Sequence, residues 1–387
     1  MQRGPTGRHE TLGVADEQVR AFVPDPLPPA PPLALDGARQ RLLERALLAC
    51  GRLDGVTAML TNSGLLLYAY VRREAVLSSQ IEGTQSSLWD PLLFEIDAAP
   101  SVPFDDIVEV SNYVAALEHG LARLRAGFPL SGRLLREVHG RLLSRGGGAD
   151  KLPGEFRRSQ NWIGGTRPGN AYFVPPPPQA LEDCMADLER FVHADDDGMP
   201  ALIRAGLAHV QFETIHPFLD GNGRVGRPLI ALMLSETQVL PQPFLYLSLY
   251  LKRHRTEYYR LLDTVRRDGD WEAWIDFFLE GVMTTAESAV DTAHRPLALF
   301  RDDAEQLRDL GRGTANALRV FDALRERPLS TVGALAERTG ASYLTVARAI
   351  DALERLGIVR EITGRKRERV FAYARYLDVL NEGADPL

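Results

Sequence analysis

The sequence predicts a mainly α-helical protein with one β-hairpin and a winged helix-turn-helix near its C-terminal end. Over most of the chain, apolar residues recur three and four positions apart, which is the spacing of one helix face. Segment 161–178 departs from this spacing, because two short apolar stretches flank glycines, a proline and an asparagine, as in a hairpin. After residue 314, three helical segments precede two short strand-like segments, which is the order of a winged helix.

Length and composition exclude several classes of protein. The 387 residues can form two or three domains, and 45% hydrophobic with 25% charged residues is typical of a soluble globular protein. The net charge of −7 argues against a protein that coats nucleic acid, although it permits a local basic patch.

Cysteine use and the N-terminal residues indicate the compartment. Cys50 and Cys184 lie too far apart for a metal motif, so we expect two buried thiols in a reducing environment. The first ten residues lack the apolar core of a signal peptide, and no apolar run reaches the length of a membrane span. We therefore expect a cytoplasmic protein with no membrane partner.

Changes in residue composition and apolar spacing along the chain predict four domains. The N-terminal segment is polar at first and then rich in proline, which predicts either an arm laid on the surface or a disordered leader. The predicted domains are residues 1–34 (proline-rich arm), 35–125 (N-terminal helical region), 126–290 (core) and 291–387 (linker helix and winged helix). Helices are expected within residues 42–48, 70–79, 107–125, 134–143, 179–194, 201–215 and from residue 271 onward.

The predicted hairpin has the sequence NWIGGTRPGNAYFVPPPP, residues 161–178. Its arms are Trp162–Ile163 and Tyr172–Val174, with a wide polar turn between them. The four prolines after the second arm prevent further strand pairing, because proline has no backbone N–H to donate. An ordinary surface hairpin is the alternative to a functional one.

Residues 216–227, HPFLDGNGRVGR, combine groups that suit a phosphate site. Gly221, Asn222 and Gly223 can take backbone angles that turn successive N–H groups toward one anion, at the start of an apolar-periodic helix. Arg224 and Arg227 are three apart, so they project from one side of that helix and suit a polyphosphate. We expect Pro228 to kink this helix locally without breaking it.

Two further side chains of this stretch suit the chemistry of phosphate transfer. Asp220 can carry Mg²⁺ that bridges two phosphates, since magnesium takes one or two carboxylates together with phosphate oxygens. His216 is a candidate general base for a hydroxyl group that attacks phosphorus. Packing does not account for these residues together at this spacing.

The stretch closely resembles the signature of Fic-domain (Fido) proteins, H-x-F-x-D/E-G-N-G-R-x-x-R, and matches every specified position. The family mostly transfers AMP from ATP to a protein hydroxyl. The resemblance implies that His216 deprotonates a Ser, Thr or Tyr, that Phe218 anchors the loop and that Asp220 binds Mg²⁺. It further implies an anion hole at Gly221, Asn222 and Gly223, with Asn222 also touching the α-phosphate, and contacts of Arg224 and Arg227 with the β- and γ-phosphates.

The resemblance extends over about residues 35–282 and the winged helix. Segment 161–178 is similar to the family's flap, which clamps the backbone of the target protein as an added strand. Residues 255–279, RTEYYRLLDTVRRDGDWEAWIDFFL, resemble the segment that closes the adenine pocket. The resemblance thus makes Tyr258 and Tyr259 candidate stacking or edge contacts for adenine, although tyrosines at helical spacing also suit a core. It implies a Fic helical core with a flap.

A second stretch, SSQIEGT, covers residues 78–84. Ser78 and Glu82 are four apart, so a helix places them on one face, and Gly83 can end that helix. A solvated helix end is the plain alternative. The stretch also resembles the inhibitory motif of Fic proteins, S/T-x-x-x-E-G/N, which implies that Glu82 pairs with Arg227 and displaces the γ-phosphate of ATP.

Other functions stay open at this point. A toxin-like branch of the family transfers phosphate instead, but its members lack the full second-arginine pattern that Arg227 satisfies. Removal of AMP by the same site is a further alternative. A DNA-binding regulator is another, because residues 357–375 hold six basic residues against two acidic ones. Winged helices also dock proteins or form dimers, so the expected partners are ATP, a protein hydroxyl (including one of this chain), and DNA or a second copy.

The winged helix has two specific expectations. Gly340 should lie in its tight turn, and Ser342 or Thr345 should begin the recognition helix.

Overall fold

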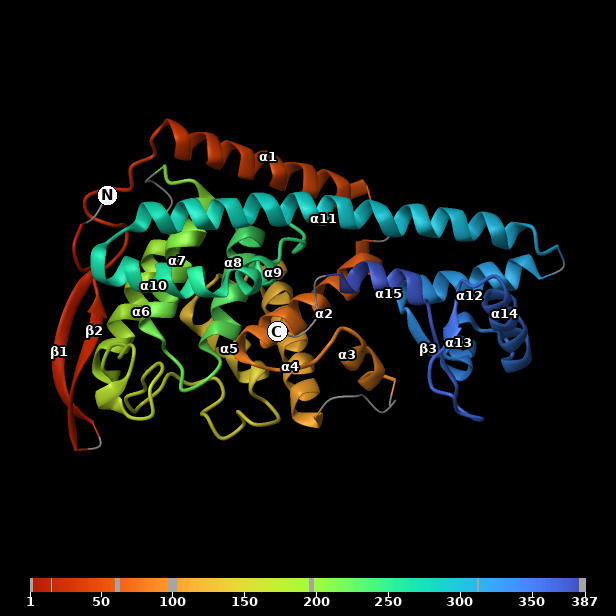
Figure 1. The fold of residues 1–387 in the computed structure, drawn as a ribbon, viewed down its shortest axis with the longest axis horizontal. Coiled ribbons are helices and arrows are strands. Elements are labelled where there is room, and N and C mark those ends of the chain that lie inside the picture. Colours follow the sequence, from red (N-terminus) through yellow and green to blue (C-terminus); the bar gives the residue numbers. More distant parts are fainter. Residues whose placement is uncertain are drawn as a thin grey trace. The chain divides into compact units, whose positions relative to one another are not determined.

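The computed structural model describes residues 3–14, 16–59, 63–96, 103–194, 198–311 and 313–382. It confirms a mainly helical protein with two small sheets (Figure 1). The chain forms two compact units: Met1–Asp54 with Ser111–Glu287, and Gly55–Val110 with Ser288–Leu387. Three helices belong partly to each unit: α1 (Gly37–Met59), α4 (Phe104–Arg125) and α11 (Trp271–Arg308). The four domains expected from the sequence stay a prediction.

The first unit is built around α7 (Ala201–Ile215), whose residues are buried from Leu202 to its end. A helix that is buried all round must be covered on every side, and α8 (Asn222–Glu236) and α6 (Leu181–Val192) pack directly against it. α5 (Gly132–Leu142) contacts α8 and α6, and α9 (Ser248–Arg253) and α10 (Arg255–Asp268) complete the helices of this unit. These positions agree with the helices expected from apolar spacing.

Pro228 lies inside α8, and the helix continues through it to Glu236. Continuation through the proline agrees with the sequence-based expectation of an unbroken helix. Cys50 and Cys184 are buried free thiols, also as expected, and burial raises the pKa of Cys50 to about 12 and that of Cys184 to about 11.

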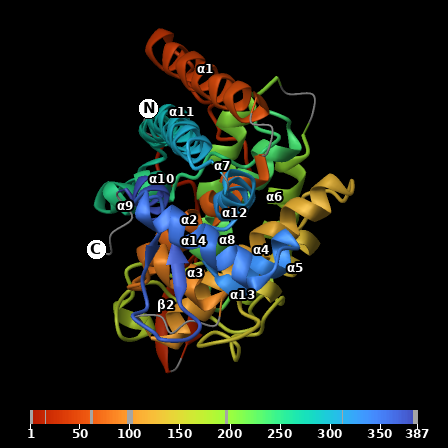
Figure 2. The same cartoon turned by 90° about the vertical axis from the view of Figure 1, so that its right-hand side faces the viewer.

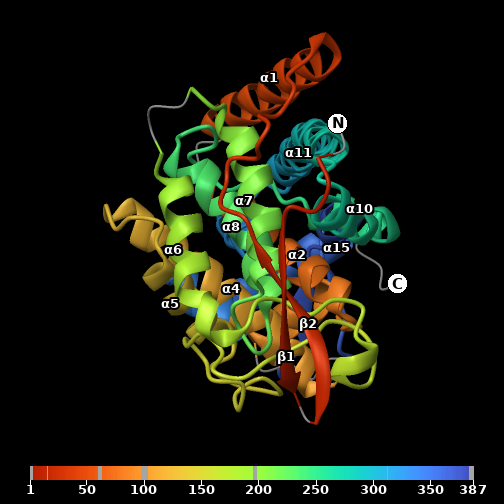
Figure 3. The same ribbon diagram turned by 90° about the vertical axis from the view of Figure 1, so that its left-hand side faces the viewer.

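The N-terminal residues differ from the prediction. Residues before the proline-rich stretch form an antiparallel hairpin that the prediction lacked, made of β1 (Gly7–Val14) and β2 (Glu17–Pro24) and visible in Figure 3, whereas residues 25–36 form neither helix nor strand and their role as an arm stays a prediction. The pairing runs from Gly7 opposite Pro24 to Val14 opposite Glu17. Val19 and Ala21 are buried on the hairpin with Val174 from the flap, a partner about 150 residues away that local composition does not reveal.

The second unit contains α2 (Ser63–Glu82), α3 (Trp89–Phe94) and the winged helix, whose helices are labelled in Figure 2. The winged helix consists of α12 (Thr314–Glu326), β3 (Leu329–Thr331), α13 (Val332–Thr339), α14 (Tyr343–Arg355), β4 (Arg360–Glu361), β5 (Val370–Ala372) and α15 (Ala374–Asn381). Its strands form an antiparallel sheet in the order β3-β5-β4. α2 packs against α12 and α15.

The expected details of the winged helix are confirmed. Gly340 ends α13 in the left-handed region with φ 65°. Ser342 caps α14, and its hydroxyl accepts a hydrogen bond from the N–H of Thr345 at 3.2 Å. In the part of the chain that the structure describes, no helix is both long enough and apolar enough to cross a membrane.

Candidate active site

The loop between α7 and α8 begins and ends in left-handed backbone. His216 caps α7 with φ 50° and ψ 59°, and its N–H donates to the carbonyl of Phe212 at 2.9 Å. Gly221 caps the start of α8 with φ 76°. Left-handed residues at both ends reverse the chain over a few positions, so the two helices can pack against each other with the signature residues between them. The half-buried His216 therefore stands at the end of a rigid, buried helix.

Phe218 anchors this loop, as its role in the signature implies. Its fully buried ring stacks on the imidazole of His139 from α5, with ring centroids 3.7 Å apart and planes 9° apart. His139 accepts the N–H of Gly154 at Nδ1 (2.9 Å), so its Nε2 carries the proton and donates to the carbonyl of Asp220 at 3.1 Å. Burial lowers the pKa of His139 to about 4, which keeps the ring neutral at neutral pH.

Asn222 also braces the loop. Its side-chain oxygen accepts the N–H of Phe218 at 2.8 Å, and its side-chain nitrogen donates to the carbonyl of Phe218 at 2.8 Å. The resemblance implied a contact of Asn222 with the α-phosphate. In the structure the amide is engaged with Phe218, and the group of Asn222 that belongs to the helix N-terminus is its backbone N–H.

The first turn of α8 has the features of an anion site. The first N–H groups of a helix precede its first internal hydrogen bond, which here runs from Val225 N–H to the carbonyl of Gly221 at 3.0 Å. Gly221 provides no side-chain cap. The helix dipole places partial positive charge at this end, so an anion is favoured there.

Two buried guanidiniums add full positive charge at the same end of α8. Arg224 and Arg227 are both buried, and Arg224 Nη2 lies 3.1 Å from Asp220 Oδ2. The other oxygen of Asp220 accepts the N–H of Gly221 at 2.7 Å. The Asp220 side chain keeps 44% of its surface exposed, so the carboxylate is accessible although it is hydrogen-bonded. The structure thus brings His216, Asp220, Gly221, Arg224 and Arg227 onto one short loop and helix start.

Arg157 is a supporting residue that sequence reasoning missed. The buried guanidinium donates from Nε to the carbonyl of His216 at 3.0 Å, and its backbone N–H donates to the carbonyl of Pro217 at 2.9 Å. It also donates to the carbonyl of Ser159, just before the flap, and to that of Pro176, among the prolines that end the flap. Burial lowers its pKa to about 10, so it stays charged at neutral pH. Its sequence context, PGEFRR, has no apolar spacing that would indicate this role.

The flap pairs as an antiparallel hairpin through one bridge, Ile163 with Phe173. The N–H of each donates to the carbonyl of the other, at 2.8 and 3.1 Å. In the wide turn, the side-chain oxygen of Asn170 accepts the N–H groups of Thr166 and Arg167, both at 3.0 Å. The arms are therefore shorter than ordinary strands, because polar groups of the turn take the place of further ladder bonds.

The two candidate adenine contacts have different surroundings. Tyr258 is buried, and its hydroxyl lies 2.9 Å from Nε2 of the fully buried His209, whose Nδ1 lies 2.9 Å from the carbonyl of Gly226. Tyr258 is thus packed in the core, and its contact with adenine stays a prediction. Tyr259 is 38% exposed beside it, so its ring is available to a ligand and its adenine contact stays a prediction.

The second stretch, residues 78–84, ends α2 as expected. Ser78 is buried, Glu82 is the exposed last residue of the helix, and Gly83 follows with φ 112°. These residues belong to the second unit, whereas Arg227 belongs to the first. The pairing of Glu82 with Arg227 stays a prediction.

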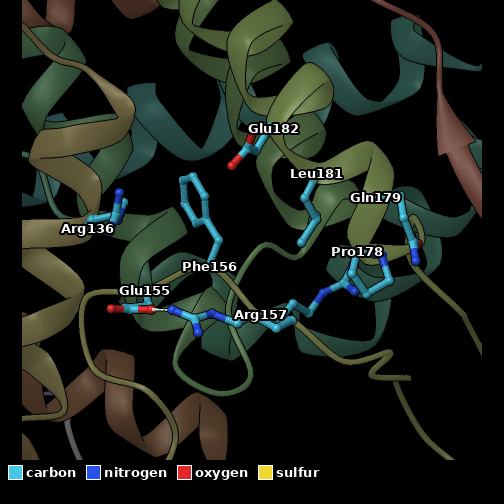
Figure 4. Close-up of a pocket in the computed structure, with 9 residues that line it drawn as sticks. Arg136, Glu155, Phe156, Arg157, Pro178, Gln179, Leu181 and Glu182 are labelled. Carbon is cyan, nitrogen blue, oxygen red and sulfur yellow. Dashed lines mark hydrogen bonds and ion pairs between the residues drawn. The ribbon is translucent and has the colours of Figure 1, made fainter.

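A cavity of about 460 Å³ adjoins the supports of the loop (Figure 4). It lies beside Phe156, whose ring is 5.4 Å from that of Phe218, and beside Arg157. The remaining residues that line it are Arg136, Glu155, Arg158, Pro178, Gln179, Leu181 and Glu182. None of the residues of the signature lines this cavity, so it is separate from the expected nucleotide site.

Family models match two consecutive parts of this chain. The model described as Fic/DOC family N-terminal matches residues 40–122. The model described as Fic/DOC family matches residues 129–234, which include the flap, the loop and most of α8.

Curated relatives share part of the sequence. A protein from Culex quinquefasciatus named Protein adenylyltransferase Fic is 33% identical over 148 residues, which cover 38% of this chain and 26% of that relative. A protein of the same name from Drosophila yakuba is 28% identical over 251 residues, which cover 62% of this chain and 47% of that relative. The chain thus spans less than half the length of these relatives.

Solved structures share the fold. A Fic family protein from Desulfovibrio desulfuricans has a TM-score of 0.58 at 20% identity, covering 86% of this chain and 95% of that one. Fic-1 from Caenorhabditis elegans has a TM-score of 0.51 at 20% identity, covering 67% and 73%. The likeness at these identities concerns the fold and confirms the expected helical core with its flap. On these matches, the chain belongs to the Fic/DOC family.

Proposed function

We propose that this protein transfers AMP from ATP to a side-chain hydroxyl of a protein, including its own chain. The observation that carries this proposal is the position of His216. It ends α7 on the short loop that leads to the N-terminus of α8, where two buried arginines lie. The printed name of the relatives, protein adenylyltransferase, supports the same activity.

The residues present fit ATP with Mg²⁺. Arg224 and Arg227 would hold the β- and γ-phosphates, and the N–H groups after Gly221 would face the α-phosphate. Asp220 would hold Mg²⁺ through its exposed carboxylate, which must then share or release its bond to Arg224. One protein carboxylate suffices, since magnesium keeps waters and phosphate oxygens as its other ligands, and the bound ion would offset phosphate charge.

His216 would act on the hydroxyl of the protein substrate. The imidazole takes the hydroxyl proton while the oxygen forms a bond to the α-phosphorus. The bond from the α-phosphorus to the bridging oxygen of the β-phosphate breaks, and pyrophosphate leaves. Arg157 holds the carbonyl of His216, so the base is presented from a fixed backbone.

We further propose that Glu82 inhibits this activity by pairing with Arg227. A carboxylate in the γ-phosphate position neutralises the arginine and repels the incoming polyphosphate. ATP would then bind with its α-phosphate misaligned for attack.

One labelling experiment tests both parts. We expect Glu82→Gly to label protein with α-phosphate-tagged ATP about 100-fold faster than wild type, because each ~1.4 kcal/mol of lost inhibition gives about tenfold and we assign two such steps to the ion pair. Glu82→Gln should be intermediate, because it keeps the shape and loses the charge. γ-Tagged ATP should give no label, which separates AMP transfer from phosphorylation.

Adding His216→Ala to the Glu82→Gly chain provides the control. Loss of a general base should lower labelling by about 10²–10⁴-fold without changing the melting temperature. Undiminished labelling would rule out His216 as the base. A folded Glu82→Gly chain that binds ATP and labels no faster than wild type would rule out the inhibitory pair.

The winged helix supports DNA binding as a second candidate function. The segment between β4 and β5 exposes Arg365, Lys366 and Arg367. Replacing these three with alanine should weaken binding to a duplex from the protein's own upstream region and flatten the salt dependence, because fewer counterions are released. An anisotropy titration measures both. Equal affinity and slope for the two forms, or no binding at low salt, would favour the docking alternative.

A further inference from the structure

The N-terminal hairpin contacts the flap at its tip through a carboxylate. Glu17, the first residue of β2, accepts the N–H of Gly169 through Oε2 at 2.6 Å, and its other oxygen pairs with the guanidinium of Arg167. Both partners lie at the turn of the flap, beside or within the short helix η1 (Pro168–Asn170). The pKa of Glu17 lies below its usual range, first because of the bond from Arg167 and then because of that from Gly169.

Gly169 makes this close approach sterically possible. A Cβ atom at this position would lie 2.4 Å from Oε2 of Glu17, closer than side-chain atoms tolerate. An alanine at this position would therefore require the Glu17 carboxylate to shift.

The hairpin also supports the base of the flap. The N–H of Phe22 on β2 donates to the carbonyl of Val174 at 2.8 Å. Val174 is buried with Val19 and Ala21, and the ring of Phe22 lies 6.1 Å from that of Phe173. The flap is thus fixed at two separate points, its apolar base and its polar tip.

These bonds join the hairpin and the flap into one hydrogen-bonded series. β1 pairs with β2, β2 bonds to Val174 in the second arm, and Phe173 pairs with Ile163 in the first arm. The first arm is the last member of this series, and Trp162, next to Ile163, is partly exposed there.

We propose that Glu17 is a positioning residue through which the N-terminal hairpin holds the flap ready for an extended segment of the protein substrate. This inference rests on the proposed AMP transfer to proteins. A flap that is ordered before the substrate arrives loses less conformational freedom on binding. This order should therefore raise the affinity for the protein substrate. ATP meets the α8 end of the site, so its affinity should not depend on Glu17.

Amide hydrogen exchange in the full chain tests the positioning without any activity. In Glu17→Ala, the amides of residues 161–174 should exchange about fivefold faster, the size expected for loss of a solvent-accessible charged contact. Glu17→Gln should fall between, because it keeps an acceptor for the N–H of Gly169. Gly169→Ala should act no more strongly than Glu17→Ala, because the flexible Glu17 side chain can shift away from the added Cβ and keep its pair with Arg167. Exchange in α7 and α8 should not change.

Glu10→Ala is the matched control. Glu10 is an exposed carboxylate on β1 of the same hairpin, where it pairs with Arg8. The Glu10→Ala substitution should leave the amide exchange rates of the flap unchanged. If both Glu17→Ala and Gly169→Ala exchange at the wild-type rate across residues 161–174, the positioning role is wrong.

A kinetic experiment tests the consequence for the substrate. In the Glu82→Gly background, with dephosphorylated casein as a hydroxyl-bearing acceptor and α-tagged ATP, Glu17→Ala should raise the KM for casein about fivefold. The KM for ATP and kcat should stay unchanged. An equal rise in both KM values, or a fall in kcat alone, would contradict the role. No labelling by the Glu82→Gly parent would count against the proposed function, while the exchange rates still decide the role of Glu17.

Discussion

The α7–α8 loop and the flap are irregular segments of the same unit, and different contacts hold them. The loop is braced from inside: Phe218 lies against His139, and the amide of Asn222 binds both backbone groups of Phe218. The tip of the flap is held at the surface, where the side chains of Glu17 and Arg167 are 24% and 62% exposed.

The difference separates two tasks of one site. In the proposed function, a base and two arginines must stay within fractions of an ångström of their working positions, which requires packed and hydrogen-bonded supports. The flap, which we propose to receive the protein substrate, tolerates more variation, because its contacts would form with the partner. Changes in the loop should therefore cost stability, whereas changes on the flap should cost substrate affinity.

The largest expected effect contrasts one aromatic residue from each segment. Phe218→Ala removes a fully buried ring and should lower the free energy of unfolding by about 3–5 kcal/mol. Trp162→Ala removes a ring that is 37% exposed and should change it by no more than about 0.5 kcal/mol. Urea titration of the full chain measures both. Similar losses in the two variants would mean that the flap is as much part of the core as the loop.

The pH dependence of stability sharpens the comparison further, because a titrating group lies under the loop. Burial lowers the pKa of His139 to about 4 in the folded state, from an ordinary value near 6.5. The unfolded state therefore binds the proton first as the pH falls, so stability present above pH 6.5 is lost between pH 6.5 and 4. The difference between these two pKa values of His139 corresponds to a loss of about 3 kcal/mol in the free energy of unfolding.

His139→Phe isolates that contribution. Phenylalanine keeps a flat ring against Phe218 and does not titrate, although it leaves the N–H of Gly154 without its acceptor. The variant should be less stable at pH 7, yet its free energy of unfolding should fall about 3 kcal/mol less than that of wild type between pH 7 and 4. Parallel curves for the two proteins would assign the acid sensitivity to other groups, such as His209, whose pKa burial also lowers to about 4.

The same comparison explains what the sequence could predict. The residues that we propose to meet substrate, such as His216 and Arg224, lie within twelve positions, and their side-chain types indicate the proposed chemistry. Helices were predicted because their apolar spacing is local. The supports are different: His139 and Arg157 act on a loop about 60 to 80 residues away, and nothing in their own neighbourhoods marks them.

The hairpin β1–β2 and Tyr258 show the same limit. The hairpin buries its apolar face on the flap, and Tyr258 points its hydroxyl at a histidine in α7. Both depend on partners that only the folded chain brings near. The spacing of apolar residues does not show that residues 7–24 pair as strands, nor that Tyr258 lies against a buried histidine.

Arg157 contacts both the loop and the flap, so a change at this residue tests whether the two segments are supported independently. Its guanidinium binds the carbonyl of His216 in the loop, that of Ser159 just before the flap and that of Pro176 near the end of the flap. Lysine keeps the positive charge but cannot reach three carbonyls in these directions. Arg157→Lys should therefore lower the free energy of unfolding by about 2 kcal/mol, the cost of buried acceptors left unpaired.

Amide exchange should show where that loss falls. In Arg157→Lys, residues 216–221 and the two ends of the flap should exchange faster together, whereas His139→Phe should affect the loop alone. Arg158→Lys is the matched control, since Arg158 is an exposed neighbour that pairs with Glu155 and should leave both segments unchanged. If Arg157→Lys loosens the flap and spares the loop, Arg157 supports the flap only. His216 would then owe its position to α7 and to the stack of Phe218 on His139, and the two segments would be fully separable.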